Sequence, residues 1–163
     1  MLKEMNMQFQ LKSIGRVEHR GDEALIVLDE EYREGLKGLE GFSHILVIWW
    51  AHMYSEDMYR AIRVLDSPYT KGPDKIGVFA TRSPVRPNPV AVSVVQAGSI
   101  DHSLGEISVP YIDAETDTPV LDIKPYHPSE DRVKNVAVPE WCGEWPKWME
   151  DSGDFDWDKV FNF

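Results

Sequence analysis

Short apolar runs at near-regular spacing constrain the fold of this 163-residue chain more than any other feature. Most of the runs are rich in β-branched and aromatic residues, and clusters of Gly, Pro, Asp and Ser separate them. The predicted strands are residues 8–17, 24–28, 45–51, 76–80, 90–97, 106–111 and 119–126. Because no long helices alternate with these runs, we expect a mostly all-β fold: a closed antiparallel β-barrel of about seven strands.

Between the strands, the sequence predicts turns and one or two short helices. Residues 20–23 are turn residues that join the first two strands in a hairpin. Asp29 can cap a short helix that contains Leu36 on its apolar face. Residues 54–75 predict a loop with a helical turn around residues 58–64.

The end of the chain has a different composition. Residues 139–163 hold four of the six tryptophans and seven acidic residues, without a regular pattern. We therefore predict a barrel domain over residues 1–138 and a tryptophan-rich acidic tail over residues 139–163. The aromatic side chains of this tail are expected to pack against the barrel or against a dimer partner.

Composition excludes several classes of protein. The apolar runs fall far short of the roughly 20 residues that a membrane-spanning helix needs, and the first ten residues have no apolar signal core. The single cysteine, Cys142, can form no internal disulfide and lacks the companions of a zinc site. We expect a cytoplasmic protein with no membrane anchor and no bound metal.

The charge is distributed unevenly. A net charge of −11 argues against a protein covered by nucleic acid, because binding to phosphates needs lysine and arginine. Residues 60–86 are the exception, with six basic residues against two acidic ones. Such a segment fits a local site for an anionic group, such as RNA backbone or a carboxylate. A solvated loop with a few cations would give the same pattern.

The most unusual segment is GVFATRSPVRPNP, residues 77–89. Each proline fixes its own φ and restricts the residue before it, so this loop is expected to be stiff. A stiff loop loses little entropy on binding, and the guanidinium groups of Arg82 and Arg86 would then meet a ligand in a preset arrangement. A β-turn whose arginines pair with surface acids is the alternative.

A second polar segment, residues 113–126, contains an acidic turn that leads into the last strand. Strict alternation would place Val120, Asp122, Lys124 and Tyr126 on one face of that strand. If this face points inward, Asp122 and Lys124 must be paired or hydrogen-bonded. If it points to water, they are ordinary solvent-facing residues.

His52, directly after the tryptophan-containing strand, is a candidate base near neutral pH, although a histidine at a strand end is also common as a structural residue. Other chemistry-bearing patterns are missing: the sequence has no dinucleotide-type glycine fingerprint, phosphate-binding loop, metal-ligand pair or Ser-His-Asp elbow at a suitable spacing.

Three linked stretches resemble a known family. EGLKGLEGFSHILVIWW, GVFATRSPVRPNPVAVSVV and TPVLDIKPYHP are similar, in order and spacing, to the TsaA/TrmO family of tRNA threonylcarbamoyladenosine methyltransferases, over residues 14–128. This resemblance implies a β-barrel that binds S-adenosyl-L-methionine without a Rossmann sheet and works as a homodimer. It also implies methylation of the exocyclic amine of threonylcarbamoyladenosine beside the anticodon of tRNA.

The resemblance carries the family's cofactor contacts onto eight residues of this chain. They are His52, Met53, Arg82, Val94, Ala114, Glu115, Thr116 and Asp117. A neutral cradle of backbone groups and apolar side chains would suit a methyl donor whose sulfonium loses its charge as the methyl group leaves.

The acceptor nitrogen bears a carbamoyl substituent that delocalises its lone pair, and it must lose a proton, so a base is useful. Our hypothesis is that Asp122 or His52 removes this proton and that Tyr126 orients the base. Arginine side chains would hold the carboxylate or a phosphate of the substrate. The predicted substrate-binding residues are Arg82, Arg86 and Lys124.

The chain departs from the family pattern at two places. Relatives carry a longer loop with a proline, arginine and glutamine motif after the first strand, whereas here residues 19–23 close the hairpin at once. The usual Asp-Gly before Thr-Pro is Thr116-Asp117, so Asp117 must take a turn geometry that glycine adopts easily.

Three functions therefore remain open. The first is a tRNA adenosine methyltransferase, and the second is an S-adenosyl-L-methionine-dependent methyltransferase that acts on another acceptor. The third is a cofactor-binding barrel without catalysis.

Some family members also have a C-terminal domain that contacts RNA, whereas the acidic tail of this chain would repel RNA.

Overall fold

The computed structural model describes residues 8–162, which fold into two compact units. The first contains residues 8–52 and Val90–Glu130, and the second contains Met53–Pro89 and residues 131–162. All strand pairings are antiparallel, and the helices are few and short. The predicted mostly β class is therefore confirmed.

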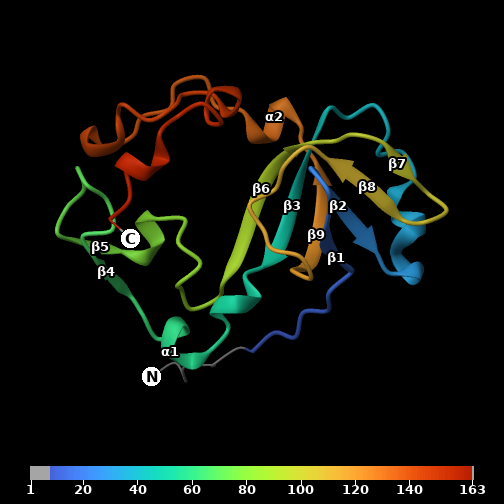
Figure 1. Ribbon diagram of the computed structural model, residues 1–163, viewed down its shortest axis with the longest axis horizontal. Helices are drawn as coiled ribbons and strands as arrows, with labels where there is room; N and C mark the ends of the chain where they lie inside the picture. The colour runs from blue at the N-terminus through green and yellow to red at the C-terminus, as the bar shows by residue number, and fades with distance from the viewer. Residues whose placement is uncertain (1–7, 163) are drawn as a thin grey trace, which may run out of the picture. The chain divides into compact units, whose positions relative to one another are not determined.

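The first unit is built on a seven-stranded antiparallel sheet in the order β6-β3-β9-β1-β2-β8-β7 (Figure 1). Its strands are β1 (Gly15–Arg20), β2 (Glu23–Leu28), β3 (His44–Trp50), β6 (Val90–Gln96), β7 (Ile100–Asp101), β8 (Glu106–Val109) and β9 (Pro119–Pro125). Six of these strands were predicted from the sequence. The two-residue β7 was not, because it is too short to show alternation.

The first predicted strand begins later than expected, at Gly15 rather than at residue 8. Gly15 pairs with Leu28, where β2 ends, and on its other side with Val120. The next residue of β9, Leu121, is skipped in the pairing of β9 with β3. The ladder with β9 ends at Gly15, although the Ile14 N–H still donates to the Val120 oxygen (2.8 Å) and the Ile14 oxygen accepts the Asp29 N–H (3.0 Å).

Closure of the sheet into a barrel stays a prediction. β6 and β7 end the strand order, and no ladder between them is recorded within residues 8–162. The segment after β6 does reach β8, because the Gly98 N–H donates to the Ser108 oxygen (2.8 Å) and the Ser108 N–H donates to the Ser99 oxygen (2.9 Å).

The hairpin of β1 and β2 has the predicted tight turn, in which Gly21 has a φ of 65°. The helix after it, η1 (Glu30–Leu36), is a 3₁₀ helix, and the Asp29 side chain makes no capping hydrogen bond to it. The predicted cap is therefore wrong. A single short segment that buries only Leu36 has too few turns to sustain an α-helix.

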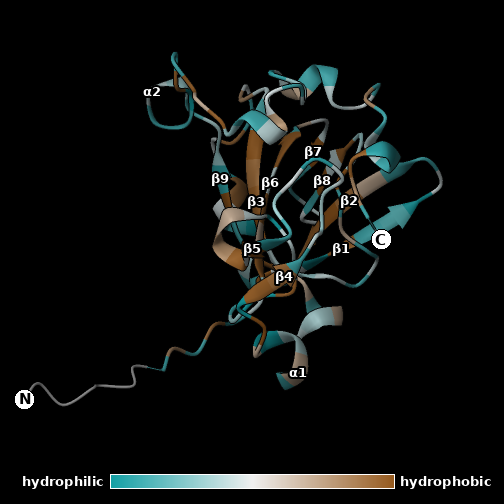
Figure 2. Ribbon diagram, turned by 90° about the vertical axis from the view of Figure 1, so that its left-hand side faces the viewer, coloured by the Kyte–Doolittle hydropathy of each residue, from teal (hydrophilic) through white to brown (hydrophobic). Residues whose placement is uncertain are grey.

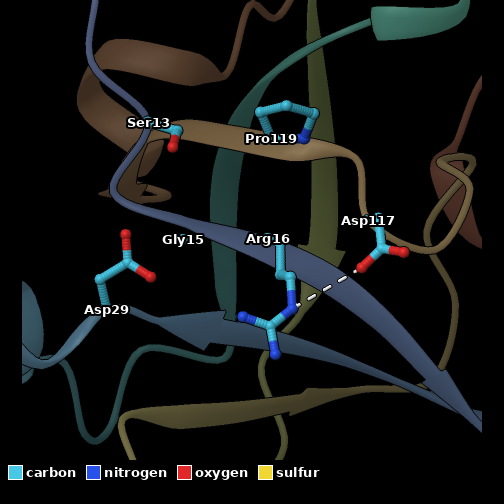
Figure 3. Close-up of a pocket in the computed structure, with 6 residues that line it drawn as sticks. All are labelled: Ser13, Gly15, Arg16, Asp29, Asp117 and Pro119. Carbon is cyan, nitrogen blue, oxygen red and sulfur yellow. Dashed lines mark ion pairs between the residues drawn. The ribbon is translucent and has the colours of Figure 1, made fainter.

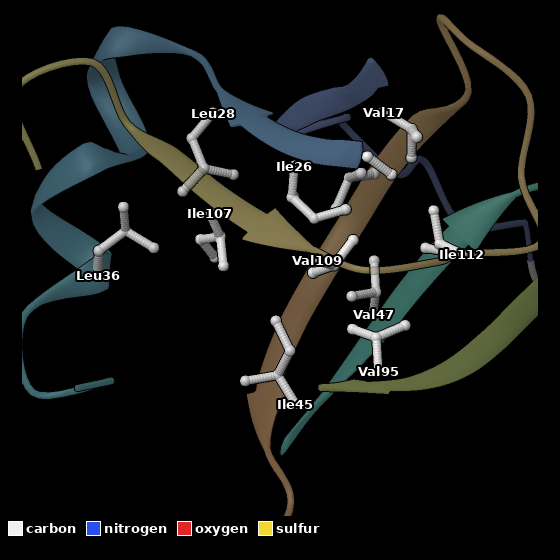
Figure 4. Close-up of a cluster of buried hydrophobic side chains, with 12 residues drawn as sticks. Val17, Ile26, Leu28, Leu36, Ile45, Val47, Val95, Ile107, Val109 and Ile112 are labelled. Atoms are coloured by element: carbon white, nitrogen blue, oxygen red, sulfur yellow. The ribbon is translucent and has the colours of Figure 1, made fainter. Parts of the chain in front are cut away.

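The hydrophobic core of the first unit lies on one face of the sheet (Figure 4). Alternate residues of β2 and β8 point into it, so that Ile26, Ile107 and Val109 are buried while their neighbours are not. Leu36 of η1 packs against the same cluster. Figure 2 shows that hydrophobic residues are concentrated on β3 and β6.

The second unit has a two-stranded ladder of β4 (Val64–Asp66) and β5 (Lys75–Gly77). Its helices before residue 90 are α1 (Asp57–Arg60) and the 3₁₀ helix η3 (Val78–Ala80); η2 (His52–Tyr54) joins the two units. The predicted strand 76–80 thus stops at Gly77. It stops because the Thr81 N–H and hydroxyl both donate to the Val78 oxygen, at 3.2 and 2.9 Å, and close a turn.

Between residues 139 and 162 the tail has three short 3₁₀ helices, η4 (Glu140–Cys142), η5 (Met149–Asp151) and η6 (Trp157–Lys159), and the short helix α2 (Pro128–Asp131) precedes it. Its aromatic rings pack around Tyr69, which stacks on Trp141 with ring centroids 4.9 Å apart and also contacts Trp145 and Phe161. Burial raises the pKa of Tyr69. The predicted domain boundary at residues 138 and 139 stays a prediction.

Candidate cofactor and substrate sites

The acidic turn before β9 is held against β1 by backbone hydrogen bonds. The Asp117 N–H donates to the Val17 oxygen (2.8 Å), and the Val17 N–H donates to the Thr118 oxygen (3.0 Å). Asp117 has a φ of 65°, which confirms that an aspartate here adopts the geometry of a glycine. The segment that carries the predicted cofactor contacts Ala114, Glu115, Thr116 and Asp117 is therefore fixed to the first hairpin.

His52 lies beside the same turn. Its Nδ1 is 3.4 Å from the Oγ1 of Thr118, a residue 66 positions further along the chain. Thr118 is buried and His52 is half-buried. The structure thus brings together two segments that the sequence analysis selected separately.

His19, which was not among the residues predicted from the sequence, completes this group. Its Nε2 lies 2.7 Å from the Ala114 oxygen, and its backbone N–H donates to the Thr116 Oγ1 at 3.3 Å. The sequence feature that could have indicated His19 is its position at the start of residues 19–23, which close the first hairpin where family members are expected to carry a longer loop. We call His19, His52 and residues 114–118 the turn site.

A small hollow of about 160 Å³ opens next to the turn site (Figure 3). It is lined by Ser13, Gly15, Arg16, Asp29, Asp117 and Pro119. The Arg16 Nε is 3.7 Å from the Asp117 Oδ1, and this carboxylate is 77% exposed. Pockets that enclose whole ligands usually measure ~300–1,000 Å³, so this hollow can hold only one end of a cofactor-sized molecule.

Asp122 and Lys124 lie on the face of β9 opposite to Val120. The reason is a bulge: Ile48 pairs with Asp122, whereas its neighbour Trp49 pairs with Val120, so Leu121 is an extra residue. The expectation that Val120 shares a face with Asp122 and Lys124 is therefore wrong. Strict alternation fails where one residue is inserted.

The Asp122 carboxylate pairs with Lys124, with Oδ2 and Nζ 2.7 Å apart, and its Oδ1 accepts the Ile123 N–H. The side chains of Asp122 and Lys124 are 49% and 62% exposed. The hydrogen bond and the attraction of the carboxylate raise the pKa of Lys124. Of the two alternatives, the solvent-facing pair is the one that the structure supports.

Val94 lies on the same face as Asp122 and Lys124. It pairs with Leu46 on β3, and Leu46 in turn pairs with Lys124 on β9.

Tyr126 lies at the other end of β3 from His52. Its N–H donates to the His44 oxygen, and its ring packs edge-on against the His44 ring. His44 and His52 are eight positions apart along β3 and the residue after it, and eight residues of extended chain span about 26 Å. The structure therefore does not bring Tyr126 to His52.

The remaining predicted contacts, Met53, Arg82 and Arg86, belong to the second unit. The 81–89 loop is braced from within: the Ser83 N–H donates to the Thr81 hydroxyl at 3.2 Å, and the Arg86 guanidinium donates to the Val78 oxygen at 3.3 Å. Arg60, which the sequence analysis did not select, donates to the Pro87 oxygen at 2.9 Å. These contacts support the predicted stiffness of the loop.

Within residues 8–162, no group of three or more histidine, cysteine or carboxylate side chains is arranged to hold a metal ion. None of the helices in the same residues has the length and apolar character needed to cross a membrane.

Residues 13–132 match the family model described as tRNA-methyltransferase O N-terminal domain. An S-adenosyl-L-methionine-binding protein of Archaeoglobus fulgidus is 34% identical over 111 residues, which cover 68% of this chain and 74% of that protein. The tRNA (adenine(37)-N6)-methyltransferase of Escherichia coli K12 is 32% identical over 126 residues, 76% of this chain and 53% of the enzyme.

The fold is also similar to that of a solved protein. The crystal structure of TrmO from Pseudomonas aeruginosa superposes with a TM-score of 0.62 and 27% sequence identity, and covers 80% of this chain. The chain spans 61% of that structure and about half of the E. coli enzyme.

Proposed function

The chain belongs to the family of the tRNA-methyltransferase O N-terminal domain, and from this premise we propose that it transfers the methyl group of S-adenosyl-L-methionine to an adenosine of tRNA. The observation that carries the proposal is the turn site, where His52 and the 114–118 turn meet. The S-adenosyl-L-methionine-binding protein of A. fulgidus supports the choice of cofactor, and the tRNA methyltransferase of E. coli supports the choice of acceptor.

The residues of the turn site fit such a cofactor. The Ala114 carbonyl and the Thr118 hydroxyl are uncharged partners, the imidazole of His52 lies beside that hydroxyl, and the exposed Asp117 carboxylate is beside Arg16. S-adenosyl-L-methionine, when bound, supplies an electrophilic methyl group on a cationic sulfur. Surroundings without a strong anion at the sulfur favour its transfer, because the positive charge on sulfur decreases in the transition state while the acceptor nitrogen takes it up. Met53, Arg82 and Val94 are proposed as further contacts.

We propose His52 as the base that accepts the proton of the acceptor amine. It is half-buried at the turn site, and a histidine exchanges protons near neutral pH. Asp122 is the second candidate, since its carboxylate is already engaged by Lys124. Arg82, Arg86 and Lys124 would hold a carboxylate or a phosphate of the substrate.

We also propose that the adenosine methylated is threonylcarbamoyladenosine. The protein is further proposed to be a homodimer, to have a closed barrel and to be located in the cytoplasm. The apolar row of Leu46, Ile48, Val92 and Val94 on the face of the sheet away from the core supports a dimer, since Val92 is 41% exposed. The hydrogen bonds from residues 98 and 99 to Ser108 support closure.

Radiolabelled S-adenosyl-L-methionine and two tRNA preparations, with and without the threonylcarbamoyl group, test the proposal. We expect label in the modified tRNA alone. Label in both would assign another acceptor, and calorimetric binding without transfer would leave a cofactor-binding protein. No binding of the cofactor at millimolar concentration would reject the proposal.

A pair of variants tests the base. His52→Gln keeps a hydrogen-bonding side chain but cannot accept the proton, so kcat should fall about 100-fold or more. Asp122→Asn is the matched control, with kcat expected to change little. The reverse pattern would assign the base to Asp122.

A further inference from the structure

Thr118 carries a hydroxyl that the fold removes from water. The residue is 1% exposed, and its backbone is fixed on both sides: its N–H donates to the Glu115 oxygen at 3.2 Å, and its oxygen accepts the Val17 N–H at 3.0 Å. Pro119 follows it and favours extended backbone at Thr118, and a β-branched side chain has few rotamers. The Oγ1 of Thr118 is therefore held in a well-defined position.

His52 is the residue that meets this hydroxyl. Because Trp49 of β3 pairs with Val120 of β9, the residues after β3 continue towards those before β9. The His52 Nδ1 lies 3.4 Å from the Thr118 Oγ1, and within residues 8–162 this is the only hydrogen bond recorded for either side chain. The distance is long for a hydrogen bond, but hydrogen bonds of catalytic groups commonly shorten as the transition-state complex forms.

This contact can be made in two ways, because a hydroxyl both donates and accepts. If the hydroxyl donates to Nδ1, the hydrogen of a neutral His52 is on Nε2, and the bond is lost when the ring becomes charged, since both nitrogens then carry hydrogen. If the Nδ1–H donates to the hydroxyl, Nε2 keeps a free lone pair, and the bond persists in both charge states. Such a neighbour sets the tautomer of a histidine.

We infer that Thr118 is a positioning residue for His52: its hydroxyl accepts the Nδ1–H and so leaves Nε2 to take the proton of the acceptor amine. The amine nitrogen gives this proton to the Nε2 lone pair when it gains its methyl group, and the imidazolium keeps its Nδ1–H on Thr118. Because the hydroxyl is uncharged, it orients the ring without placing an anion near the sulfonium. This inference rests on the proposed function and adds the group that prepares its base.

Long-range ¹H–¹⁵N NMR spectra of the protein without substrate test the tautomer directly, and His52→Gln identifies the His52 signals by their loss. At a pH at which His52 is neutral, we expect the hydrogen on Nδ1 in the unaltered protein and in Thr118→Ser, which keeps the hydroxyl. Thr118→Val has a similar shape without the hydroxyl and should shift the hydrogen towards Nε2, because the Nδ1–H would lose its acceptor. If the valine variant fails to fold, the spectrum of the unaltered protein still decides.

Methyl transfer measures the consequence for the reaction. Thr118→Val should lower kcat about 3- to 10-fold, the effect of one neutral hydrogen bond, and Thr118→Ser should restore most of it. The calorimetric affinity for S-adenosyl-L-methionine should change little, because the backbone hydrogen bonds that hold the turn do not involve this side chain. Thr70→Val is the matched control: it removes a hydroxyl that donates to the Lys159 oxygen at 2.9 Å in the second unit, and kcat should not change.

Two results would overturn the inference and leave the proposed methyl transfer standing. One is hydrogen on Nε2 of His52 in the unaltered protein. The other is an unaltered tautomer in Thr118→Val with cofactor affinity and kcat lowered together, which would assign Thr118 to the shape of the turn alone. Absence of transfer by the unaltered protein to either tRNA preparation would instead reject the proposed function, and the spectra would still decide whether Thr118 sets the tautomer of His52.

Discussion

Asp117 takes a left-handed backbone conformation that costs an L-residue with a Cβ about 1–2 kcal/mol. Its φ of 65° is imposed by the hydrogen bonds between the turn and Val17. An aspartate tolerates this geometry better than most residues because its short polar side chain can interact locally, here with Arg16. Asp117 therefore holds this turn in a conformation that a glycine would adopt without this cost.

Two substitutions at this position separate the backbone cost from the ion pair. Asp117→Gly and Asp117→Ala both remove the carboxylate, but only alanine keeps a Cβ. We expect the glycine variant to be more stable by about 1 kcal/mol in urea unfolding. Equal stability of the two variants would contradict a strained conformation at residue 117.

His19 is expected to position the 114–118 turn for the cofactor. His19→Ala removes the contact with the Ala114 oxygen, so the affinity for S-adenosyl-L-methionine should fall about tenfold in calorimetry, the loss expected for one hydrogen bond. His19→Gln, which can donate to the same oxygen, should restore part of it. His102→Ala removes another exposed histidine of the first unit and should have no effect. Equal affinities for all four proteins would rule out this role.

At the scale of elements, the pairing of β1 with β2 depends on a close approach at Gly15. A Cβ at this position would lie 2.1 Å from the Val27 oxygen and 2.8 Å from the Leu28 Cα, both of them backbone atoms that cannot move aside. Position 15, at the start of β1 and beside the hollow, therefore accommodates only glycine without a shift of the backbone.

Gly15→Ala should destabilise the protein by about 1–3 kcal/mol, the usual cost of overpacking. Gly35→Ala is the matched control, because no heavy atom lies within 4 Å of the added Cβ and its φ is not positive. We expect the control to be neutral or slightly stabilising. Chemical denaturation measures both, and similar midpoints would show that the hairpin can adjust.

The bulge in β9 is another feature of this scale, and it decides which side chains share a face. Residues 119–126 have the alternation of a regular strand, but β3 pairs with Asp122 and then with Val120. The inserted Leu121 leaves both Val120 and Ile123 packed on the core and turns Asp122 away from it. Such an insertion depends on the neighbouring strand and leaves no mark in a single sequence.

At the scale of the whole molecule, the two units are held together internally by different means. The first has an aliphatic core beneath its sheet, whereas the second relies on aromatic rings gathered around Tyr69. An aromatic cluster of this kind can order a segment that has hardly any regular secondary structure.

Tyr69→Ala should therefore disorder the tail while the sheet persists. We expect loss of the near-ultraviolet circular dichroism of the tryptophans and about 2–3 kcal/mol of stability in the second unit. Hydrogen exchange of the β2 and β8 amides should not change. Trp148→Ala is the control, since Trp148 is exposed and contacts Arg132 instead of the cluster. A cooperative loss of both units would show that they unfold as one.

The sequence by itself determined six of the seven strands of the first unit, the tight turn at Gly21, the special geometry of Asp117 and the motifs that include His52 and Arg82. These features depend on local properties: side-chain alternation, turn residues and motif spacing. Only the tertiary structure decided the bulge at Leu121 and the contact of His19 with the 114–118 turn. Each of these depends on which residue lies opposite or above another, and that is set by strand register and packing between segments far apart in the chain.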